Sequence, residues 1–268
     1  MSLKVATWNI NSVRLRIGLV TRLLERWQPD VLCLQETKCP QGQFPSGPLR
    51  DLGYSHIAEF GQKGYHGVAI VSKRPFTAQA SRRFCGKDDC RHLAVTLGGA
   101  TPIIIHNLYV PAGGDEPDPA INEKFAHKLQ FIAELENWFA KDCVPKGHES
   151  ILVGDLNIAP LAQDVWSHKD LLKVVSHTPV ETEGLLRIQK TGKWIDLMRQ
   201  HVPAEEKLYT WWSYRARDWE VSDRGRRLDH IWSTAGLAPA CRKIEILKEA
   251  RGWEQPSDHV PVMASFAG

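Results

Sequence analysis

The sequence predicts an α/β fold built on largely antiparallel or mixed β-sheets. Short apolar runs with strand character recur along the chain, and several follow one another through short turns. Helical spacing of apolar residues is clear in only two segments. Helices are therefore fewer and more widely spaced than in a strict alternation of parallel strands and helices.

The strand-like segments are short runs dominated by apolar residues, which is typical of buried strands. No low-complexity linker or internal repeat separates them, and 268 residues with 43% hydrophobic residues can bury the core of one large domain. We therefore expect a single domain over residues 1–268. The expected strands are residues 3–8, 31–35, 68–72, 93–97, 103–110, 151–153, 228–233, 244–247 and 260–266.

Two helices are expected from the spacing of apolar residues. Between residues 17 and 27, the apolar positions 19, 20, 23, 24 and 27 fall on one face, and Pro29 ends the segment. Between residues 122 and 139, the apolar positions 125, 129, 132, 135 and 139 do the same.

Composition limits the partners and the compartment. The N-terminus lacks a basic region followed by an apolar one, and no segment approaches the roughly 18 apolar residues of a membrane span. We therefore expect a soluble, cytoplasmic protein with no membrane partner, acting as a monomer. The net charge of +3 and the pI near 8.5 permit a polyanionic partner without requiring one.

The six cysteines contain no C-x-x-C pair, so we expect reduced thiols. The short gap between Cys85 and Cys90 is only a weak indication of metal or redox chemistry.

The segment ILVGDLNIAP, residues 151–160, runs from an apolar strand directly into Gly-Asp-Leu-Asn. Gly154 lets the backbone turn or approach another group closely. Asp155 and Asn157 are two residues apart, so in extended backbone their side chains share a face. From this segment alone two interpretations stay open, a turn whose side chains bond their own backbone or part of a functional site.

Polar residues that can bind metals or phosphates recur where the apolar strands end. Singly, each has an ordinary explanation, because a surface Glu is usually solvated and a strand-end Tyr is usually packed. Their repetition along one chain favours a shared site. Carboxylate and amide oxygens suit Mg²⁺ or Mn²⁺, whereas the cysteines are not spaced for zinc. The residues concerned are Asn9, Asn11, Glu36, Lys38, Tyr109, Asp155, Asn157, Asp229, Asp258 and His259.

The motifs that contain these residues resemble those of the exonuclease III family of abasic-site endonucleases, within the endonuclease/exonuclease/phosphatase superfamily. The motifs appear in the family's order and span nearly the whole chain: WNIN at 8–11, LQETK at 34–38, Tyr109 in YVP, GDLN at 154–157, RLD at 227–229 and SDH at 257–259. The resemblance implies a four-layer α/β sandwich, in which two packed mixed sheets are flanked by helices.

The same resemblance implies an activity and a substrate. The expected activity is a Mg²⁺-dependent cut on the 5′ side of abasic sites, together with 3′-to-5′ exonuclease and 3′-phosphodiesterase activity. The expected partner is double-stranded DNA with abasic sites or 3′ ends, and the expected cofactor is Mg²⁺ or Mn²⁺.

The resemblance also assigns roles to the strand-end residues. The catalytic set would be Tyr109, Asp155, Asn157, Asp229 and His259. The metal set would be Asn9, Glu36, Asp155, Asn157, Asp258 and His259, with Glu36 as the principal ligand and Asp258 near a second metal.

Within the catalytic set, Asp155 would orient or deprotonate the attacking water and Asn157 would donate to a phosphate oxygen. Tyr109 would stabilise negative charge, and Asp229 would hold His259 in one tautomer. Whether one metal or two operate, and which of Asp155, His259 and Tyr109 transfers the decisive proton, stays open.

Residues 209–227 interleave aromatic side chains with five arginines, a pattern that fits phosphate contacts beside a stacking platform. The alternative is that Trp211, Trp212 and Trp219 only pack a long loop onto the sheets. The resemblance favours Trp211 and Leu228 as walls of a pocket for a flipped abasic sugar. The DNA-binding set would be Asn11, Arg14, Lys38, Trp211, Arg226, Arg227 and Leu228.

Two positions depart from the family pattern. Arg226 stands where an apolar residue usually precedes the R-[IL]-D triplet, and Ala112 stands where Asn or Gln often follows the Tyr. The loop PAGGDEPDP after Tyr109 is short and acidic, so it cannot wedge an arginine into the duplex. Two rival functions stay open, a phosphodiesterase acting on another phosphate ester and an inactive DNA-binding module.

Overall fold

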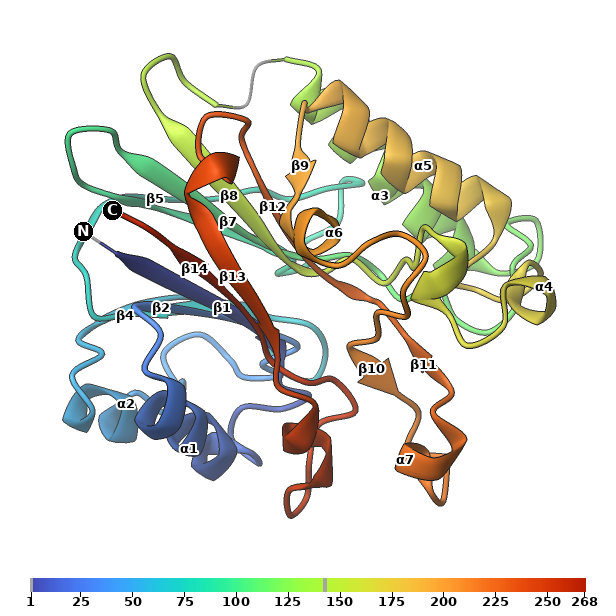
Figure 1. The fold of residues 1–268 in the computed structure, drawn as a ribbon, viewed down its shortest axis with the longest axis horizontal. Coiled ribbons are helices and arrows are strands. Elements are labelled where there is room, and N and C mark those ends of the chain that lie inside the picture. Colours follow the sequence, from blue (N-terminus) through green and yellow to red (C-terminus); the bar gives the residue numbers. More distant parts are fainter. Residues whose placement is uncertain (1, 142–143) are drawn as a thin grey trace.

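Two β-sheets pack face to face, and helices cover their outer faces, in the computed structural model of residues 2–141 and 144–268 (Figure 1). Each of the two sheets has six strands. Helices α1 and α2 cover the first sheet, and α3 and α5 cover the second. The predicted four-layer sandwich is therefore confirmed.

The first sheet has the strand order β13-β14-β1-β2-β4-β3. Strands β1 and β2 are parallel, and the other neighbours are antiparallel. Its strands are β1 (Leu3–Asn9), β2 (Val31–Gln35), β3 (His56–Phe60), β4 (Val68–Ser72), β13 (Cys241–Ile246) and β14 (Val262–Phe266).

The second sheet has the strand order β5-β6-β7-β8-β12-β9, and β7 and β8 are its parallel pair. The parallel pairs matter because the carboxyl ends of parallel strands meet at one edge of a sheet. Its strands are β5 (Phe76–Ser81), β6 (His92–Leu97), β7 (Ile103–Tyr109), β8 (Glu149–Asp155), β9 (Ile195–Asp196) and β12 (Asp229–Ser233).

The helices and a small hairpin complete the fold. The hairpin of β10 and β11 projects from the sandwich with α7 at its tip (Figure 1). The helices are α1 (Ile17–Trp27), α2 (Gly47–Asp51), α3 (Glu123–Phe139), α4 (His168–Leu171), α5 (Pro179–Thr191), α6 (Leu197–His201) and α7 (Trp219–Ser222). The hairpin strands are β10 (Trp211–Trp212) and β11 (Gly225–Arg226), and short 3-10 helices span Ala162–Asp164, Ala238–Ala240 and Lys248–Gly252.

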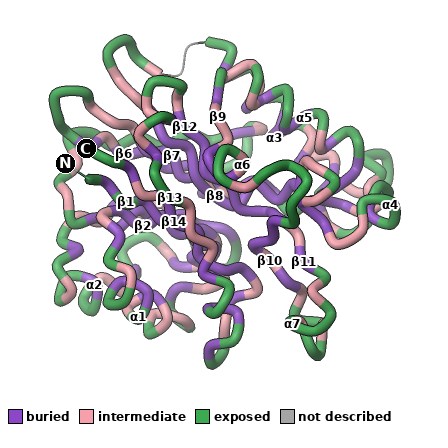
Figure 2. The backbone as a smooth tube through the Cα atoms, viewed as in Figure 1, coloured by how far each residue is buried: buried purple, intermediate pink, exposed green. Residues whose placement is uncertain are grey.

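Three apolar layers hold the sandwich together, and they appear as the buried interior of Figure 2. The middle layer lies between the two sheets and includes Val5, Ile70 and Ile151. The outer layers lie under the helices, with Leu24 from α1 in one and Phe131 from α3 in the other. The central strands β1, β2, β4, β8 and β12 are thus buried on both faces, which explains why they read as continuous apolar runs rather than as alternating ones.

The predicted strands and both predicted helices are confirmed to within a few residues at each end. Among the elements that the sequence patterns did not predict are β3, β5 and α5. Strand β5 is an exposed edge strand and has little apolar signal. Helix α5 buries Glu181 and Gly184 beside Leu185 and Ile188, so its buried face carries no apolar stripe. Its start was readable, because Thr178-Pro179-x-Glu181 matches a capping box with Pro at the first helical position.

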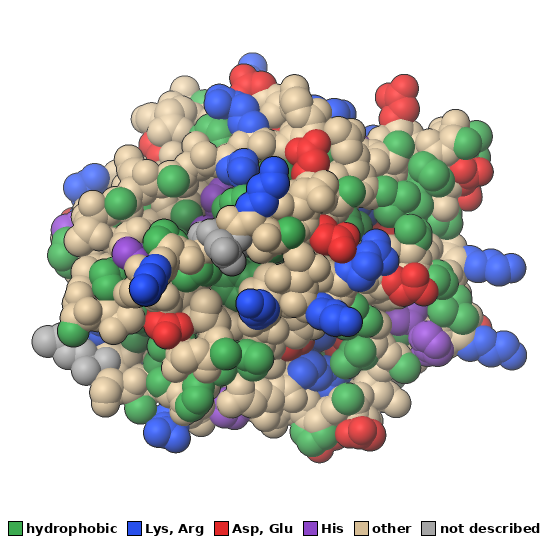
Figure 3. Space-filling model, turned by 90° about the horizontal axis from the view of Figure 1, so that it is seen from above, with side chains coloured by type: hydrophobic (Ala, Val, Ile, Leu, Met, Phe, Trp, Pro, Cys, Tyr) green, Lys and Arg blue, Asp and Glu red, His purple; other side chains and the backbone are tan. Residues whose placement is uncertain are grey.

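No helix in the described part of the chain is long and apolar enough to cross a membrane. The face seen in Figure 3, the upper side of Figure 1, carries basic and acidic side chains interspersed with one another.

Gly154 is the position in β8 where the backbone leaves no room for a side chain. Its φ is +143°, and a Cβ would lie 1.9 Å from the carbonyl oxygen of Leu108 in the parallel neighbour β7. We expect Gly154→Ala to destabilise the protein by at least about 1–3 kcal/mol, because two rigid strands would have to separate. Thermal or urea unfolding measures the loss.

The control for this prediction is Gly18→Ala in α1, where a Cβ would meet nothing within 4 Å. Gly18→Ala should stabilise the protein by roughly 0.5–1 kcal/mol, as alanine does in an ordinary helix. A Gly154→Ala protein as stable as the parent would show that β7 and β8 are farther apart than described.

Candidate active site

The predicted strand-end residues converge at one edge of the sandwich, where strands of both sheets end. Asn9 ends β1 and Glu36 follows β2, so both leave the parallel pair of the first sheet. Tyr109 and Asp155 end the parallel pair β7 and β8 of the second sheet and lie opposite each other in register. Asp229 begins β12 directly opposite Asp155, because β12 runs antiparallel to β8.

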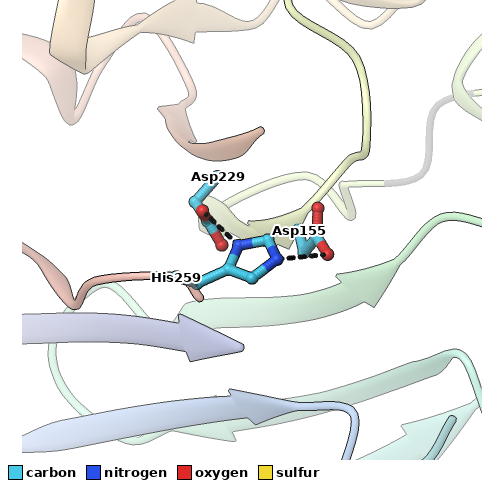
Figure 4. A group of neighbouring side chains, drawn as sticks. All are labelled: Asp155, Asp229 and His259. Atoms are coloured by element: carbon cyan, nitrogen blue, oxygen red, sulfur yellow. Dashed lines mark hydrogen bonds and ion pairs between the residues drawn. The ribbon is translucent and has the colours of Figure 1, made fainter. Parts of the chain in front are cut away.

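His259 lies between two carboxylates at the centre of the site, as Figure 4 shows. Its Nδ1 is 2.8 Å from Oδ2 of Asp229, and its Nε2 is 3.7 Å from Oδ2 of Asp155. All three side chains are buried. A carboxylate can only accept, so Nδ1 carries a hydrogen and Nε2 faces Asp155. This agrees with the predicted role of Asp229 in orienting the imidazole.

The protonation of His259 and Asp155 follows from their burial and from the neighbouring charges. Burial lowers the pKa of His259, but the charges of Asp229 and Asp155 outweigh it and raise that pKa above its usual value. Burial raises the pKa of Asp155, although the neighbouring His259 partly opposes the shift. Asp155 thus binds a proton more readily than an exposed carboxylate does, as a general base requires.

Asn9 joins the two sheets at the site. Its Nδ2 donates to Oε2 of Glu36 at 3.1 Å and to Oδ2 of Asp155 at 2.8 Å. Its Oδ1 accepts the backbone N–H of Asn11, which fixes the orientation of the amide. Asn9 therefore acts here as a donor that brings two carboxylates together. Its predicted role as a metal ligand stays a prediction.

Asn157 also holds Asp155. The backbone N–H of Asn157 donates to Oδ1 of Asp155 at 2.9 Å, and its Nδ2 donates to Oδ2 of Asp155 and to the carbonyl of Val110. In this geometry the amide hydrogens are engaged within the protein, and the expected donation to a phosphate oxygen stays a prediction. Its remaining oxygen leaves the predicted metal role open.

Tyr109 lies half-buried with the Arg91 guanidinium 5.0 Å from the centre of its ring. Burial raises the pKa of Tyr109, and the charges of Glu36 and Asp155 raise it further. The phenol therefore keeps its proton and can donate to negative charge that develops nearby.

A second group of side chains lies at the rim. Asp258 accepts from Nε1 of Trp211 at 2.9 Å and from Nδ2 of Asn11 at 3.3 Å. Lys38 donates to Oδ1 of Asn11 at 2.7 Å and forms an ion pair with Glu36 at 2.8 Å. These contacts place Asn11 and Lys38 beside the carboxylates, whereas Arg14 is exposed and makes no described contact there.

A cavity of about 710 Å³ opens over these residues. Its lining includes the carboxylates of Glu36, Asp155 and Asp258 with His259, and also Trp166, Trp211, Leu228 and Arg226. The Arg226 guanidinium lies 5.3 Å from the centre of the Trp211 ring and donates to the carbonyl of Val175 and to Oγ of Ser176. The prediction that Trp211, Leu228 and Arg226 share a wall is consistent with this geometry.

Arg227 does not contact DNA in this fold, and that prediction is wrong. Its side chain is 1% exposed and pairs with Asp164 at 2.9 Å and with Asp196 at 2.6 Å. Burying an arginine requires such partners, which the sequence places far from it along the chain. Arg227 instead anchors the backbone just before Asp229.

The donor set fits a hard divalent cation. Asp155, Asp229 and His259 offer ligand atoms that all lie within 4.8 Å of one another. Oδ1 of Asp229 is buried and has no hydrogen-bond partner among the described residues. Glu36 and Asp155 accept from the same nitrogen of Asn9, so their oxygens lie close enough for a shared ion. Among the described cysteines, Cys33, Cys39, Cys85, Cys90 and Cys241 are free, and Cys143 lies outside the described residues.

Three residues that support the site were missed. Oγ of Ser257 donates to the carbonyl of Asn9 at 2.6 Å, and Nε1 of Trp8 donates to the carbonyl of His259 at 3.0 Å. Oγ1 of Thr210 accepts the backbone N–H of Asp229 at 3.1 Å. Ser257 and Trp8 stand inside the SDH and WNIN motifs, so their place beside the site residues was the available signal.

Nearly the whole chain is similar to known nucleases and related hydrolases. The sequence profile described as "Endonuclease/Exonuclease/phosphatase family" matches residues 6–259. Exodeoxyribonuclease III of Haemophilus influenzae is 30% identical, and the match covers 98% of this chain and 100% of that protein.

Two solved structures are also similar. An AP endonuclease from Archaeoglobus fulgidus has a TM-score of 0.91 with 32% identity, over 99% of this chain and 100% of that one. The 3′ phosphatase NExo from Neisseria, solved with a product DNA hairpin, has a TM-score of 0.89 with 31% identity over the same shares.

We expect Asp155→Asn and His259→Ala each to lower turnover of a phosphodiester substrate by roughly 10²–10⁴-fold, because Asp155 is the candidate base and His259 lies directly beside it. The double variant should be little worse than the poorer single variant, since the two neighbouring side chains act as one unit. Single-turnover rates at saturating substrate measure these losses.

His201→Ala, at the exposed end of α6, is the matched control and should keep the parent rate. Circular dichroism should show all variants folded. Losses that multiply in the double variant would instead assign Asp155 and His259 to independent steps.

Proposed function

The chain belongs to the endonuclease/exonuclease/phosphatase family, within its exonuclease III branch of hydrolytic nucleases, and from that premise we propose that it is a Mg²⁺-dependent DNA repair nuclease. Its proposed reaction is cleavage of the phosphodiester on the 5′ side of abasic sites in duplex DNA. We include 3′-to-5′ exonuclease and 3′-phosphodiesterase activity in the proposal. Membership of a hydrolytic family argues against the rival interpretation as an inactive DNA-binding module.

The observation that carries this proposal is the convergence of Glu36, Asp155 and His259 at the rim of one cavity. Hydrolysis of a phosphodiester needs an aligned water, neutralisation of charge on the phosphate and stabilisation of the leaving oxygen. When bound, Mg²⁺ would supply Lewis-acid stabilisation of that charge, and Glu36 with Asp155 would hold it.

The protein groups divide the remaining tasks. Asp155, beside Nε2 of His259, accepts a proton from the attacking water. The His259 imidazolium, held by Asp229, stabilises negative charge on a phosphate oxygen. The protonated phenol of Tyr109 lines the same cavity and donates to the phosphate or to the leaving oxygen.

The apolar part of the cavity lining supports abasic recognition. Trp211 and Leu228 present apolar surface against which a flipped deoxyribose without a base can pack. The related AP endonuclease and the DNA-bound 3′ phosphatase support DNA as the substrate class. We propose in addition that residues 1–268 act as one catalytic domain and as a cytoplasmic monomer.

The direct test is cleavage of a duplex with one abasic analogue, and of a duplex with a 3′ phosphate, with and without Mg²⁺. We expect no cleavage in excess EDTA and full recovery on adding Mg²⁺, because hard cations with few protein ligands exchange readily. Cleavage at the parent rate in EDTA would contradict the metal mechanism, and inactivity on both duplexes with Mg²⁺ present would contradict the proposed substrate.

Glu36→Gln should raise the Mg²⁺ concentration needed for half-maximal rate. Loss of an outer-shell partner already costs roughly 10–100-fold in metal affinity, so loss of a ligand should cost at least about as much. The control is Glu25→Gln on the exposed face of α1, which should leave the Mg²⁺ requirement unchanged. An unchanged requirement in Glu36→Gln would remove Glu36 from the metal site.

Trp211→Ala should depress abasic-site cleavage with little change in melting temperature, because Trp211 lines the cavity and is only half-buried. A stacked ring contributes about 1–3 kcal/mol, which is roughly tenfold to a hundredfold in rate or affinity. The neighbouring Trp212 is 2% exposed and packs on Val260, so Trp212→Ala should instead lower the melting temperature. The reverse pattern would make Trp211 the core residue.

Arg226→Leu should weaken binding to undamaged duplex and flatten its salt dependence by about one phosphate contact. Binding titrations between low and physiological salt measure the slope. The same slope in Arg226→Leu and in the parent would show that Arg226 only braces the turn at residues 175–176 and does not meet DNA.

A further inference from the structure

Lys128 is a charged residue on the buried face of α3, where the surrounding side chains are apolar. It is fully buried, in line with Phe125 and Phe131. Burial lowers the pKa of its ammonium group, and the charge of Glu181 opposes that shift. A buried ammonium without partners would be strongly destabilising, so its contacts show what it holds.

The three donors of the Lys128 ammonium reach three separate segments. Nζ lies 2.5 Å from Oε1 of Glu181, 2.8 Å from the carbonyl oxygen of Asn157 and 3.2 Å from that of Ala112. The turn beside Ala112 follows the Lys128 stem closely, because a Cβ on Gly113 would lie 2.9 Å from Cδ of Lys128. One side chain therefore ties the segments that follow β7 and β8 to α5.

Glu181 extends the same network to the turn before α5. Its carboxylate accepts the backbone N–H of Ser176 at 2.9 and 3.0 Å, that of Thr178 at 3.2 Å, and Oγ1 of Thr178 at 2.6 Å. This turn also supports Arg226, which lines the cavity, because Oγ of Ser176 accepts a hydrogen bond from Arg226 at 2.8 Å. Glu181 is itself fully buried.

Two of the segments so held have backbone conformations that need support. Asn157 has φ of 53° and Ser176 has φ of 85°, in the left-handed region that non-glycine residues rarely adopt. Ala112, Asn157 and Ser176 all line the cavity over the carboxylates. The N–H of Asn157 also donates to Oδ1 of Asp155, so the position of Asn157 sets a contact of the proposed base.

We propose that Lys128 and Glu181 are positioning residues for the reaction, and that this buried pair fixes Asn157 under Asp155 and holds the turn at 175–178 against the cavity. The proposal deepens the nuclease function proposed above and rests on it for its kinetic readout. The pair touches neither substrate nor the reacting atoms, so its effect is on geometry and therefore on kcat.

The alternative is an ion pair that only stabilises the packing of α3 on α5. A test must remove both charges together, because removing one would leave a lone buried charge and destabilise the fold for that reason alone. In Lys128→Met/Glu181→Gln the stem at position 128 is kept and its donors are lost. In Lys128→Gln/Glu181→Gln a neutral donor remains near the two carbonyl groups.

The matched control is Glu136→Gln/Arg187→Met. This pair joins the same two helices at 3.4 Å but is exposed, away from the cavity. Steady-state kcat and KM are measured on the abasic and 3′-phosphate duplexes below the melting temperature of every variant. Hydrogen–deuterium exchange is measured for residues 155–158 and 174–178.

We expect kcat of Lys128→Met/Glu181→Gln to fall about 10–100-fold with KM unchanged, because small displacements of catalytic groups have costs of this size. Exchange in both segments should accelerate. In Lys128→Gln/Glu181→Gln, both kcat and the exchange rates should lie between those of Lys128→Met/Glu181→Gln and those of the parent. The control should match the parent in both measurements.

Parent values of kcat and of exchange in a folded Lys128→Met/Glu181→Gln protein would overturn the proposal. If that variant does not fold, Lys128→Met/Glu181→Leu provides the test, since it replaces both charges with apolar side chains of similar size and leaves no lone buried charge. Parent exchange and parent kcat in Lys128→Met/Glu181→Leu would then overturn the proposal. A parent enzyme inactive on both duplexes would contradict the proposed function only, because the exchange rates would still decide whether the pair positions these segments.

Discussion

The bond from Asn9 to both Glu36 and Asp155 is the interaction on which the site depends, because it joins the two sheets at the edge where their parallel pairs end. The first sheet alone would offer Glu36, and the second sheet alone would offer Asp155 and Asp229. The shared donor on Asn9 offsets the repulsion between the carboxylates of Glu36 and Asp155 at short range. A cation can then bind between the two carboxylates. The apolar layer between the two sheets sets the distance between Glu36 and Asp155. The packing of the core therefore also determines the geometry of the site.

Around that contact the protein supplies a donor for most carboxylate oxygens. Asp155 accepts from Asn9 and from the backbone and side chain of Asn157. Asp229 accepts from His259 at one oxygen, and its other oxygen is buried without a described partner. Such fixed donors act in a site shielded from water, where they have larger effects than in solution and need not reorganise during the reaction. Lys128 and Glu181 hold the backbone behind these donors, because Lys128 donates to the carbonyl of Asn157 and Glu181 accepts from the N–H of Ser176.

Much of the fold and most of the site could be predicted from the sequence, because both depend on short local signals. Strands buried on both faces give continuous apolar runs, and polar residues at their ends are visible as breaks in those runs. The GDLN segment illustrates the limit. Its side chains do bond local backbone, as a turn would, since Asn157 donates to Asp155, yet the same bonds orient a carboxylate at the site. The turn interpretation is therefore confirmed, and these bonds support the interpretation as part of a functional site, which stays a prediction.

Two of the failures share a physical cause, which is charge neutralised by partners distant in sequence. The sequence indicates a DNA contact at Arg227 because its partners Asp164 and Asp196 are remote along the chain. Helix α5 lacks an apolar stripe because Glu181 occupies its buried face, where Lys128 neutralises its charge. The spacing of apolar residues in the sequence does not reveal such buried ion pairs. A charged residue on a buried helix face therefore looks like a surface residue until the structure shows its partner.

The measurement that tests the central claim most directly is an anomalous difference map of crystals soaked in Mn²⁺. The account predicts a peak at the edge where the two sheets meet, with a Glu36 oxygen at roughly 2.0–2.2 Å, as expected for a small divalent cation. Density for Mn²⁺ only at exposed acidic side chains, with Glu36 still bound to Asn9 and Lys38 alone, would contradict it.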